Sequence, residues 1–346
     1  MRLFQGSISS GGESSGSAIE VAGLAKSFGQ YRALREVNLR VPAGSVVCVL
    51  GRNGAGKTTT VRILTTLIRP DAGRALVAGY DIATEPERVR SRIGVAWQGA
   101  SLDQVLTGRQ NLRLLGRFHH LGARGADRRA EELLEQFGMT YAADKPVGTY
   151  SGGMRRRLDL AVSLLPEPQV LFLDEPTTGL DPISRTETWR IVRDVAAGGT
   201  AVLLTTQDMQ EASALADEIV VLVGGRVLHE GTPSELTAAA GRARVRVTLP
   251  EARPELVGAT STALGPSAAV AGRVVTVPAP NALADLAAVV ERLTLHGVEV
   301  HDVGLEHPTL AEIYAELTAE PPGGADRRSE PRAGADSVGS DAVERV

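Results

Sequence analysis

The sequence predicts an α/β protein with a mostly parallel sheet, made of one large domain and one small domain. Short apolar segments that fit buried parallel strands lie at 45–50, 169–175 and 200–206 and alternate with segments of helical spacing. This alternation is typical of a parallel sheet with helices on both faces. After about residue 240, short alternating strands and two amphipathic helices predict a second, smaller α/β domain.

Changes in composition along the chain predict where the domains begin and end. Residues 1–17 are rich in Ser and Gly, and residues 320–346 in Pro, Gly and charge, so we expect both to be disordered tails. The large domain is then expected over 18–240 and the small domain over 241–319. Strand signals vanish at about 98–165 while helical apolar spacing continues, which predicts a helical subdomain inserted between strands.

Charge and composition narrow the class of protein. The 346 residues are 43% hydrophobic and 23% charged, as in an ordinary globular protein, and the formal net charge of −4 argues against nucleic acid as a partner. No apolar run reaches the length of about 18 residues that spans a bilayer, so action at a membrane would require another chain. The single cysteine, Cys48, excludes an intrachain disulfide and fits a cytoplasmic compartment.

The first buried strand leads directly into a phosphate-binding motif. The segment "GRNGAGKT" at 51–58 matches G-x-x-x-x-G-K-[ST], between a strand and a helix as the motif requires. Its glycines allow a tight turn in which backbone N–H groups point at phosphate oxygens, and the helix N-terminus adds positive charge. Lys57 can reach the β- and γ-phosphates, and the Thr58 hydroxyl can ligate Mg²⁺. The predicted ATP-binding residues of this loop are Gly51, Arg52, Asn53, Gly54, Ala55, Gly56, Lys57, Thr58 and Thr59.

Two carboxylates end the strand expected at 169–175. Four apolar residues bury this strand, so Asp174 lies at its tip, where it can hold Mg²⁺ directly or through water. Glu175 follows and can orient or deprotonate an attacking water. The phosphate loop upstream makes this pair a strong candidate for catalysis.

A second glycine-rich turn occurs at 150–161, "YSGGMRRRLDLA". Its Ser-Gly-Gly sequence leads into a helix and exposes N–H groups and a hydroxyl at the helix N-terminus, which makes a second anion site. Ordinary phosphate-loop proteins have no such second site in their sequence, so this turn discriminates between classes.

Taken in order, these motifs resemble the ATP-binding subunits of ABC transporters over about residues 19–235. The set comprises the phosphate loop, Gln98, the Ser-Gly-Gly turn, "LDEPTTGLDP" and the "TTQ" strand tip. "GAGKTTTVRILTTLIRPDAG", "TGRQNL" and "YSGGMRRRLDLA" are similar to the daunorubicin/doxorubicin-resistance type of drug-exporter ATPase. "HPTLAEIYAELTA" at 307–319, expected to be a helix, resembles the C-terminal motif of that group.

The resemblance implies a P-loop NTPase fold, an ABC-type nucleotide-binding domain, that uses ATP and Mg²⁺. Phe28 would stack on adenine, and Gln98 would contact Mg²⁺ and the attacking water. ATP would be sandwiched in a homodimer, with a separate permease of the ABC-2 type at the cytoplasmic face of the cell membrane. The dimer would power efflux of an anthracycline-like drug or natural product. The residues implied to act across the dimer interface are Ser151, Gly152, Gly153 and Asp181.

The strand tip "LLTTQDMQ" carries the largest departure from that superfamily, in which histidine is usual at the position of Gln207. We expect Gln207 to sense phosphate by hydrogen bonding, while Glu175 handles the water and Lys57 completes the catalytic set. Asp208 and Glu211 are spaced much like a capping box, which predicts that a helix begins here.

A smaller departure lies in the phosphate loop, where Arg52 replaces the usual proline. This position mainly needs a permitted backbone shape, so the sequence alone predicts little effect.

Two other functions are compatible with parts of the sequence. One is an ABC ATPase acting on ribosomes or DNA, although such relatives usually carry two cassettes or long insertions, and this chain has one phosphate loop. The other is a nucleotide-binding regulator that hydrolyses ATP poorly, which Gln207 suggests and the intact Asp174 and Glu175 oppose.

Overall fold

The computed structural model describes residues 17–97, 102–239, 243–306, 312 and 314. The predicted tails lie outside these residues, except for Ser17, which begins the first strand. The helix predicted at 307–319 lies outside them too, apart from Glu312 and Tyr314.

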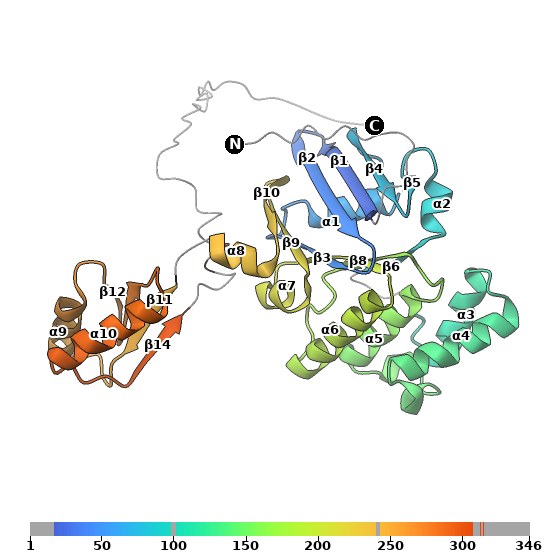
Figure 1. Ribbon diagram of the computed structural model, residues 1–346. Coiled ribbons are helices and arrows are strands. Elements are labelled where there is room, and N and C mark those ends of the chain that lie inside the picture. The colour runs from blue at the N-terminus through green and yellow to red at the C-terminus, as the bar shows by residue number, and fades with distance from the viewer. Residues whose placement is uncertain (1–16, 98–101, 240–242, 307–311, 313, 315–346) are drawn as a thin grey trace, which may run out of the picture.

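A six-stranded sheet in the order β10-β9-β3-β8-β7-β6 forms the centre of the large domain (Figure 1). All neighbouring strands are parallel except β10 and β9, which form an antiparallel hairpin. The prediction of a mostly parallel sheet is therefore confirmed. The strands are β3 (Val46–Leu50), β6 (Ile93–Ala96), β7 (Val170–Asp174), β8 (Ala201–Thr206), β9 (Glu218–Val223) and β10 (Arg226–Gly231).

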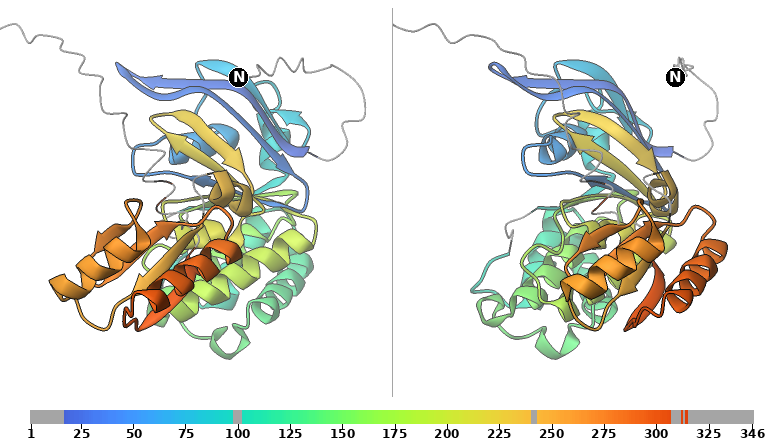
Figure 2. Two further views of the ribbon diagram at one scale, coloured as in Figure 1. Left: turned by 60° about the vertical axis from the view of Figure 1, so that its left-hand side comes forward. Right: turned by 90° about the vertical axis from the view of Figure 1, so that its left-hand side faces the viewer.

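One face of this sheet is covered by an antiparallel sheet in the order β2-β1-β4-β5, together with helix α1 (Figures 1 and 2). Helix α1 fits the prediction of helices on both faces, but it shares this face with an antiparallel sheet that the sequence analysis did not predict. Alternate side chains of a strand point to opposite faces, so Val47 and Val49 of β3 join this layer. The elements are β1 (Ser17–Phe28), β2 (Tyr31–Pro42), α1 (Lys57–Leu64), β4 (Ala72–Val77), β5 (Tyr80–Asp81) and, beside them, α2 (Pro86–Arg90).

Helices cover the opposite face, where Val46, Cys48 and Leu50 of β3 join the larger hydrophobic core. The predicted helical subdomain packs here: residues 102–165 contain no strand, and α3 begins at a capping box of Thr107 and Gln110. The helices of this layer are α3 (Gly108–Phe118), α4 (Gly122–Gln136), α5 (Gly152–Ser163), α6 (Pro182–Ala197) and α7 (Met209–Leu215), with short 3₁₀ turns at Thr140–Ala142 and Val147–Thr149.

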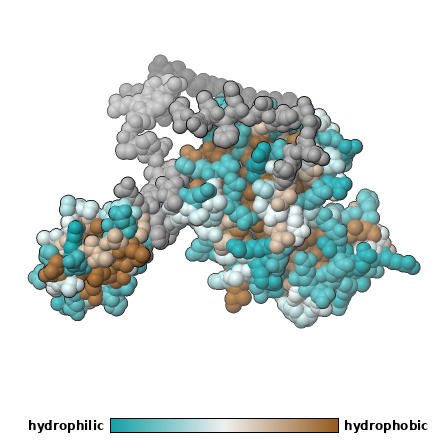
Figure 3. All heavy atoms as spheres, in the orientation of Figure 1, coloured by the Kyte–Doolittle hydropathy of each residue, from teal (hydrophilic) through white to brown (hydrophobic). Residues whose placement is uncertain are grey.

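The small domain has a four-stranded antiparallel sheet in the order β12-β13-β11-β14 and a hydrophobic core of its own. Figure 3 shows apolar side chains on its surface, and its exposed apolar residues are Val270, Leu283, Val290 and Leu295. After α8 (Pro233–Ala239), its elements are β11 (Arg244–Thr248), α9 (Pro254–Leu264), β12 (Ala269–Ala271), β13 (Val274–Pro278), α10 (Leu283–Leu295) and β14 (Asp302–Glu306).

Candidate functional site

The phosphate loop joins the end of β3 to the start of α1, and its glycines are required by the backbone. Gly54 and Gly56 have positive φ angles of 81° and 108°, which other residues rarely adopt. A Cβ atom on Gly56 would lie 2.6 Å from the Leu34 side chain, and one on Gly51 would lie 2.6 Å from the Leu222 carbonyl oxygen. The loop therefore depends on glycine for both conformation and space.

Lys57 turns back onto the loop that precedes it. Its side chain is only 5% exposed, and its Nζ donates to the carbonyl oxygens of Gly51 at 2.7 Å and Arg52 at 3.3 Å. The Glu175 carboxylate lies 3.6 Å from the same nitrogen. These partners compensate the burial of the ammonium charge and hold it at the mouth of the loop.

Asp174, at the end of β7, binds two hydroxyl groups. Thr58 Oγ1 lies 3.0 Å from Asp174 Oδ2, and Thr205 Oγ1 donates to Asp174 Oδ1. A carboxylate next to a hydroxyl is an oxygen donor set that Mg²⁺ accepts when phosphate and water complete its shell, so Thr58 and Asp174 fit that ion. In the described residues, no group of three or more His, Cys, Asp or Glu side chains could hold a metal ion.

Glu175 adopts a strained backbone conformation beside these residues. Its φ angle is 49°, a left-handed value that costs a non-glycine residue about 1–3 kcal/mol. Its N–H donates to the Thr205 carbonyl oxygen at 3.0 Å, and its carboxylate accepts from Thr178 Oγ1 at 3.2 Å. Strain of this kind persists at sites where the position of a side chain matters more than local stability.

A cavity of about 150 Å³ gathers most of the predicted phosphate-loop residues at the carboxyl ends of the parallel strands. Ligands of open α/β sheets bind at this edge. The cavity is lined by Tyr31, Ala33, Arg52, Asn53, Gly54, Gly56, Lys57, Thr58, Thr59 and Glu175.

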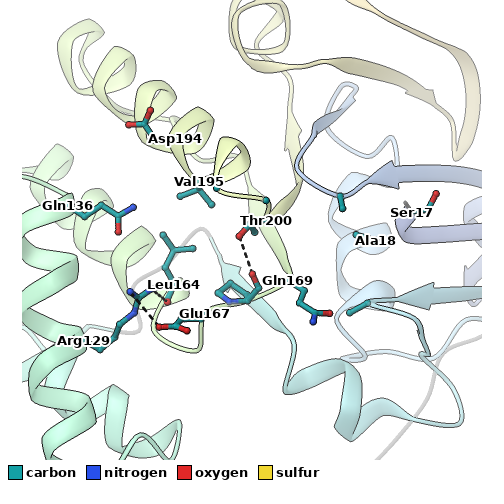
Figure 4. A pocket seen from close by; sticks show the side chains of 15 residues that line it. Ser17, Ala18, Arg129, Gln136, Leu164, Glu167, Gln169, Asp194, Val195 and Thr200 are labelled. Carbon is teal, nitrogen blue, oxygen red and sulfur yellow. Dashed lines mark hydrogen bonds and ion pairs between the residues drawn. The ribbon is translucent and has the colours of Figure 1, made fainter. Parts of the chain in front are cut away.

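A larger cavity, of about 650 Å³, lies at the opposite edge of the sheet (Figure 4). Thr200 and Gln169, which precede β8 and β7, line it, so it faces the amino ends of the strands. Two of its polar side chains form hydrogen bonds within the chain: Thr200 Oγ1 donates to the Pro168 carbonyl oxygen, and Arg129 donates to that of Leu164. The larger cavity is therefore not the one that contains the predicted phosphate loop, which lines the smaller cavity at the carboxyl ends of the strands.

Two aromatic residues flank the turn between β1 and β2, and sequence reasoning identified only one. Phe28 is 50% exposed, with Lys26 Nζ 5.7 Å from the centre of its ring. Tyr31, its strand partner, lines the cavity and donates through its hydroxyl to the Gly54 carbonyl oxygen at 2.7 Å. The signal that could have found Tyr31 is its place at the other end of a four-residue hairpin turn, opposite Phe28.

Gln207 follows β8 directly, at the predicted strand tip, and its side chain is exposed. Asp208 caps α7 by accepting from the N–H groups of Gln210 and Glu211. The capping-box analogy is wrong in its second half, because the Asp208 N–H donates to Thr206 Oγ1 and Glu211 points into the core.

Glu211 is a buried carboxylate that sequence reasoning missed as part of the site. It is 1% exposed and accepts from Thr177 Oγ1 at 2.7 Å and Trp189 Nε1 at 3.3 Å. Burial raises the pKa of its carboxyl, against the opposing effect of these hydrogen bonds. Through Thr177, Glu211 connects the helix after Gln207 to the loop after Glu175. The sequence signal that could have identified Glu211 as buried is the spacing of apolar residues in α7. Glu211 lies next to Ala212 and four positions before Leu215, and all three are on the buried face.

The Ser-Gly-Gly turn is built differently. Ser151 caps α5 by accepting from the Met154 N–H at 3.2 Å, and both Ser151 and Gly152 are exposed. Gly153 packs tightly, since a Cβ atom there would lie 2.3 Å from Ser184 Oγ. None of these three residues lines the cavity at the phosphate loop.

Asp181 caps α6 and meets the Ser-Gly-Gly turn through Ser184. Its carboxylate accepts from the N–H groups of Ser184 at 3.0 Å and Ile183 at 3.1 Å and from Ser184 Oγ at 2.7 Å. The hydrogen bonds from Ser184 are the main cause that lowers the pKa of Asp181. The cap holds this carboxylate on Ser184, the residue against which Gly153 packs.

Arg156, on the helix that follows the Ser-Gly-Gly turn, contacts the residue after Glu175 and the residue after β6. Its Nε donates to the Pro176 carbonyl oxygen at 2.6 Å, and its Nη1 donates to that of Trp97 at 3.0 Å. Burial lowers the pKa of this guanidinium. Gln98, the predicted Mg²⁺ contact that follows Trp97, lies outside the described residues.

Comparison with known proteins identifies relatives over most of the chain. The model of the ABC transporter family matches residues 34–178. The chain is 52% identical to the daunorubicin resistance ATP-binding protein DrrA3 of Streptomyces coeruleorubidus, over 90% of this chain and 97% of that protein. It is 44% identical to the daunorubicin/doxorubicin resistance ATP-binding protein DrrA of Streptomyces peucetius, over 90% and 94%.

Solved structures show the same fold. An ATP-binding subunit of an ABC transporter superposes with a TM-score of 0.58 at 29% identity, covering 64% of this chain and 92% of that one. The ATP-binding cassette MJ0796, solved as a dimer bound to ADP and Pi, gives a TM-score of 0.56 at 25% identity, covering 62% and 98%. Among the residues that the structure describes, no helix is long and apolar enough to cross a membrane.

Proposed function

Because the chain belongs to the ABC transporter family, in the group of daunorubicin- and doxorubicin-resistance ATP-binding proteins, we propose that it powers a two-component exporter. It is an ATP-binding subunit and an ATPase. We propose that its cargo is a drug or natural product of the anthracycline type, which leaves through a separate membrane permease. The names of the relatives support this choice of cargo.

One observation carries the proposal: the groups needed for phosphoryl transfer converge at one edge of the sheet. Lys57 and Thr58 follow β3, and Asp174 and Glu175 lie at the end of β7, so two segments far apart in the sequence meet at the carboxyl ends of these strands. This arrangement supports binding of a nucleotide through its phosphates, with a carboxylate placed to act on water.

In the proposed complex, the N–H groups of the loop over 51–59 and the Lys57 ammonium hold the β- and γ-phosphates. Thr58 and Asp174, with Gln98, hold Mg²⁺, which neutralises phosphate charge when bound. Phe28 stacks on adenine.

The proposed hydrolysis needs only two further side chains from the same protomer. Glu175 orients the attacking water and accepts its proton, because its carboxylate lies at the cavity with few competing hydrogen-bond donors. Gln207 hydrogen-bonds the γ-phosphate from the tip of β8, since a glutamine amide can donate without carrying charge.

The second half of the site is proposed to come from the partner protomer. Ser151, Gly152 and Gly153 bind the γ-phosphate held by the other chain, and Asp181 crosses the homodimer interface. The exposure of Ser151, Gly152 and Asp181, and the separation of the Ser-Gly-Gly turn from the phosphate-loop cavity, support this arrangement. The dimer of MJ0796 supports it independently.

The remaining parts of the chain are assigned to partners and regulation. We propose that the large domain covers 18–240 and that its helical subdomain contacts an ABC-2 type permease at the cytoplasmic face of the cell membrane. The small domain, 241–319, is proposed to stabilise the dimer or regulate it. Neither proposal involves nucleic acid.

The substitution Glu175→Gln tests the function. It should leave Mg-ATP binding intact, stop hydrolysis and trap a closed dimer, which size-exclusion chromatography with saturating Mg-ATP would detect. The matched control combines it with Lys57→Ala, which should remain monomeric because the phosphates are no longer held. A Glu175→Gln chain that stays monomeric at saturating Mg-ATP contradicts the sandwich.

The cargo needs a separate test. Cells that express the chain with its permease should retain less anthracycline than cells that express the Glu175→Gln variant with the same permease. If the two strains retain equal amounts of anthracycline although the native chain hydrolyses ATP, the cargo is a different compound.

A further inference from the structure

The buried side chain of Tyr314 contacts the phosphate loop. Tyr314 is 6% exposed and packs in the core that includes α5, α6 and α7. Its hydroxyl oxygen accepts from the Arg52 backbone N–H at 3.1 Å, across 262 positions of the sequence. The C-terminal part of the chain thus contributes a hydrogen-bond acceptor to the nucleotide site.

The contact involves the same peptide group that holds Lys57. The Gly51 carbonyl oxygen accepts from Lys57 Nζ at 2.7 Å, and the Arg52 N–H belongs to the same peptide unit. A trans peptide places its C=O and N–H on opposite sides, so Lys57 holds one side of this unit and Tyr314 the other. Hydrogen bonds in such a chain polarise one another, so an acceptor for the N–H strengthens the carbonyl as an acceptor for the ammonium.

This hydrogen bond depends on the residue that departs from the family pattern. In the family that the sequence resembles, proline is usual at position 52. Proline has no backbone N–H and could not donate to Tyr314. Arg52 restores the donor. The sequence alone suggested that this position matters only for backbone shape, whereas the structure gives its N–H a specific partner.

The loop has a second tyrosine against which Tyr314 can be compared. The Tyr31 hydroxyl donates to the Gly54 carbonyl oxygen, further along the loop, and Tyr31 is 56% exposed. Tyr31 fixes a part of the loop that does not hold Lys57. Of these two tyrosines, Tyr314 is the one that contacts the peptide group that binds the ammonium.

We propose that Tyr314 is a positioning residue for Lys57, acting through the Gly51–Arg52 peptide, so that the C-terminal part of the chain sets the nucleotide affinity of the phosphate loop. This rests on the proposed role of Lys57 in holding the ATP phosphates. Loss of the Tyr314 hydroxyl leaves the ammonium less well oriented and weakens ATP binding.

The test compares Tyr314→Phe in two backgrounds of the full-length chain. The Arg52→Ala background keeps the N–H, and there Tyr314→Phe should weaken Mg-ATP affinity about fivefold, the effect of one neutral hydrogen bond. The Arg52→Pro background lacks the N–H, and there the same change should have no effect. Phenylalanine keeps the ring in the core, so the fold should survive, and thermal unfolding would check this.

Two results would overturn the proposal. One is an equal effect of Tyr314→Phe in both backgrounds, which would assign the tyrosine a packing role only. The other is unchanged or tighter affinity in the Arg52→Ala background.

A measurement without nucleotide separates this inference from the proposed function. In the nucleotide-free chain, Tyr314→Phe should speed hydrogen exchange of the Arg52 amide about fivefold, because that amide loses its acceptor. Unchanged exchange overturns the contact itself. A native chain that fails to bind Mg-ATP contradicts the proposed function, whatever the exchange rate of this amide.

Discussion

The phosphate loop and the Ser-Gly-Gly turn are both glycine-rich segments at helix N-termini. They differ in how many of the groups around them are buried and have partners within the same chain. Lys57 and Asp174 are 5% and 6% exposed. Lys57 donates to a carbonyl oxygen of its own loop and lies 3.6 Å from the Glu175 carboxylate, and Asp174 binds the hydroxyl groups of Thr58 and Thr205. Ser151 and Gly152 are exposed, and the Ser151 hydroxyl caps its own helix. Buried charges need partners inside the protein, whereas exposed N–H groups keep water until a ligand arrives.

This difference indicates how the two regions work. The phosphate loop is shaped before nucleotide binds, so its affinity should be a property of one chain. The Ser-Gly-Gly turn begins with two exposed residues and does not line the phosphate-loop cavity, so its effect should depend on a second chain. The predictions that follow test this contrast, beginning with the largest expected effect.

Lys57→Ala should strongly weaken ATP binding by the single chain. Removing one partner of a buried charge pair costs about 2–5 kcal/mol, which is roughly 30-fold to several thousand-fold in affinity. Here the pair is the Lys57 ammonium with the ATP phosphates, and the Glu175 carboxylate loses its ion-pair partner as well. Equilibrium binding of Mg-ATP measures the effect. Lys145→Ala, an exposed lysine far from the loop in sequence, is the matched control and should bind as the native chain does.

Gly152→Ala should leave ATP affinity of the single chain unchanged and reduce turnover at least tenfold. A Cβ atom at Gly152 meets nothing within 4 Å in its own chain, so the fold should be unaffected. The methyl group would instead enter the surface that is proposed to face the partner's phosphate. Steady-state hydrolysis and nucleotide binding together measure the split. Weakened binding in the monomer would place this turn and the phosphate loop in one site.

Mixing the two variants sharpens the comparison. A heterodimer of Lys57→Ala and Gly152→Ala chains contains one intact phosphate loop facing one intact Ser-Gly-Gly turn, so part of the turnover should return. A chain that carries both substitutions is the control and should stay inactive when mixed with itself. If mixing restores nothing while dimers form, the two half-sites do not meet across the interface.

Gln207→Ala should lower turnover about tenfold with little change in ATP affinity. Its exposed amide lies at a strand tip, where it can form one charge-assisted hydrogen bond to phosphate, worth about 1.5–3 kcal/mol. Gln207→His retains a hydrogen-bond donor and should recover most of the activity. Unchanged turnover in Gln207→Ala would reduce this residue to a structural role.

Asp159→Asn should stabilise the fold by about 1 kcal/mol at pH 7.5, a value reduced for the partial exposure of this side chain. Asp159 lies on α5, behind the Ser-Gly-Gly turn, and burial raises the pKa of its carboxyl from 3.8 to about 6. Between pH 3.8 and about pH 6, the folded chain therefore binds more protons than the unfolded chain does. The native protein consequently loses stability as the pH rises through this range.

Urea unfolding at pH 7.5 and pH 5 measures this effect. The stability difference between Asp159→Asn and the native chain should shrink at the lower pH, where the native carboxyl is protonated. An equal difference at both pH values would mean that the variant acts through packing and not through charge.

Local sequence predicted the parts of the site that depend on neighbouring residues. The phosphate loop, the carboxylates after β7 and the strand that ends before Gln207 could all be read from short motifs. The antiparallel sheet over one face could not, because its strands 17–28, 31–42 and 72–77 pair through contacts that no local pattern specifies. For the same reason, the capping-box spacing could not show that Glu211 turns inward.

By itself, the sequence determined the chemistry of this protein. A glycine at a position of positive φ, a lysine after it and two carboxylates after an apolar run follow from backbone geometry and charge over a few residues. Tertiary structure alone decided which distant groups complete that chemistry. Thr205 on Asp174, Glu211 on Thr177 and Tyr314 on Arg52 are hydrogen bonds between segments far apart in the chain. Such contacts form only once the whole core has packed and fixed the positions of both partners.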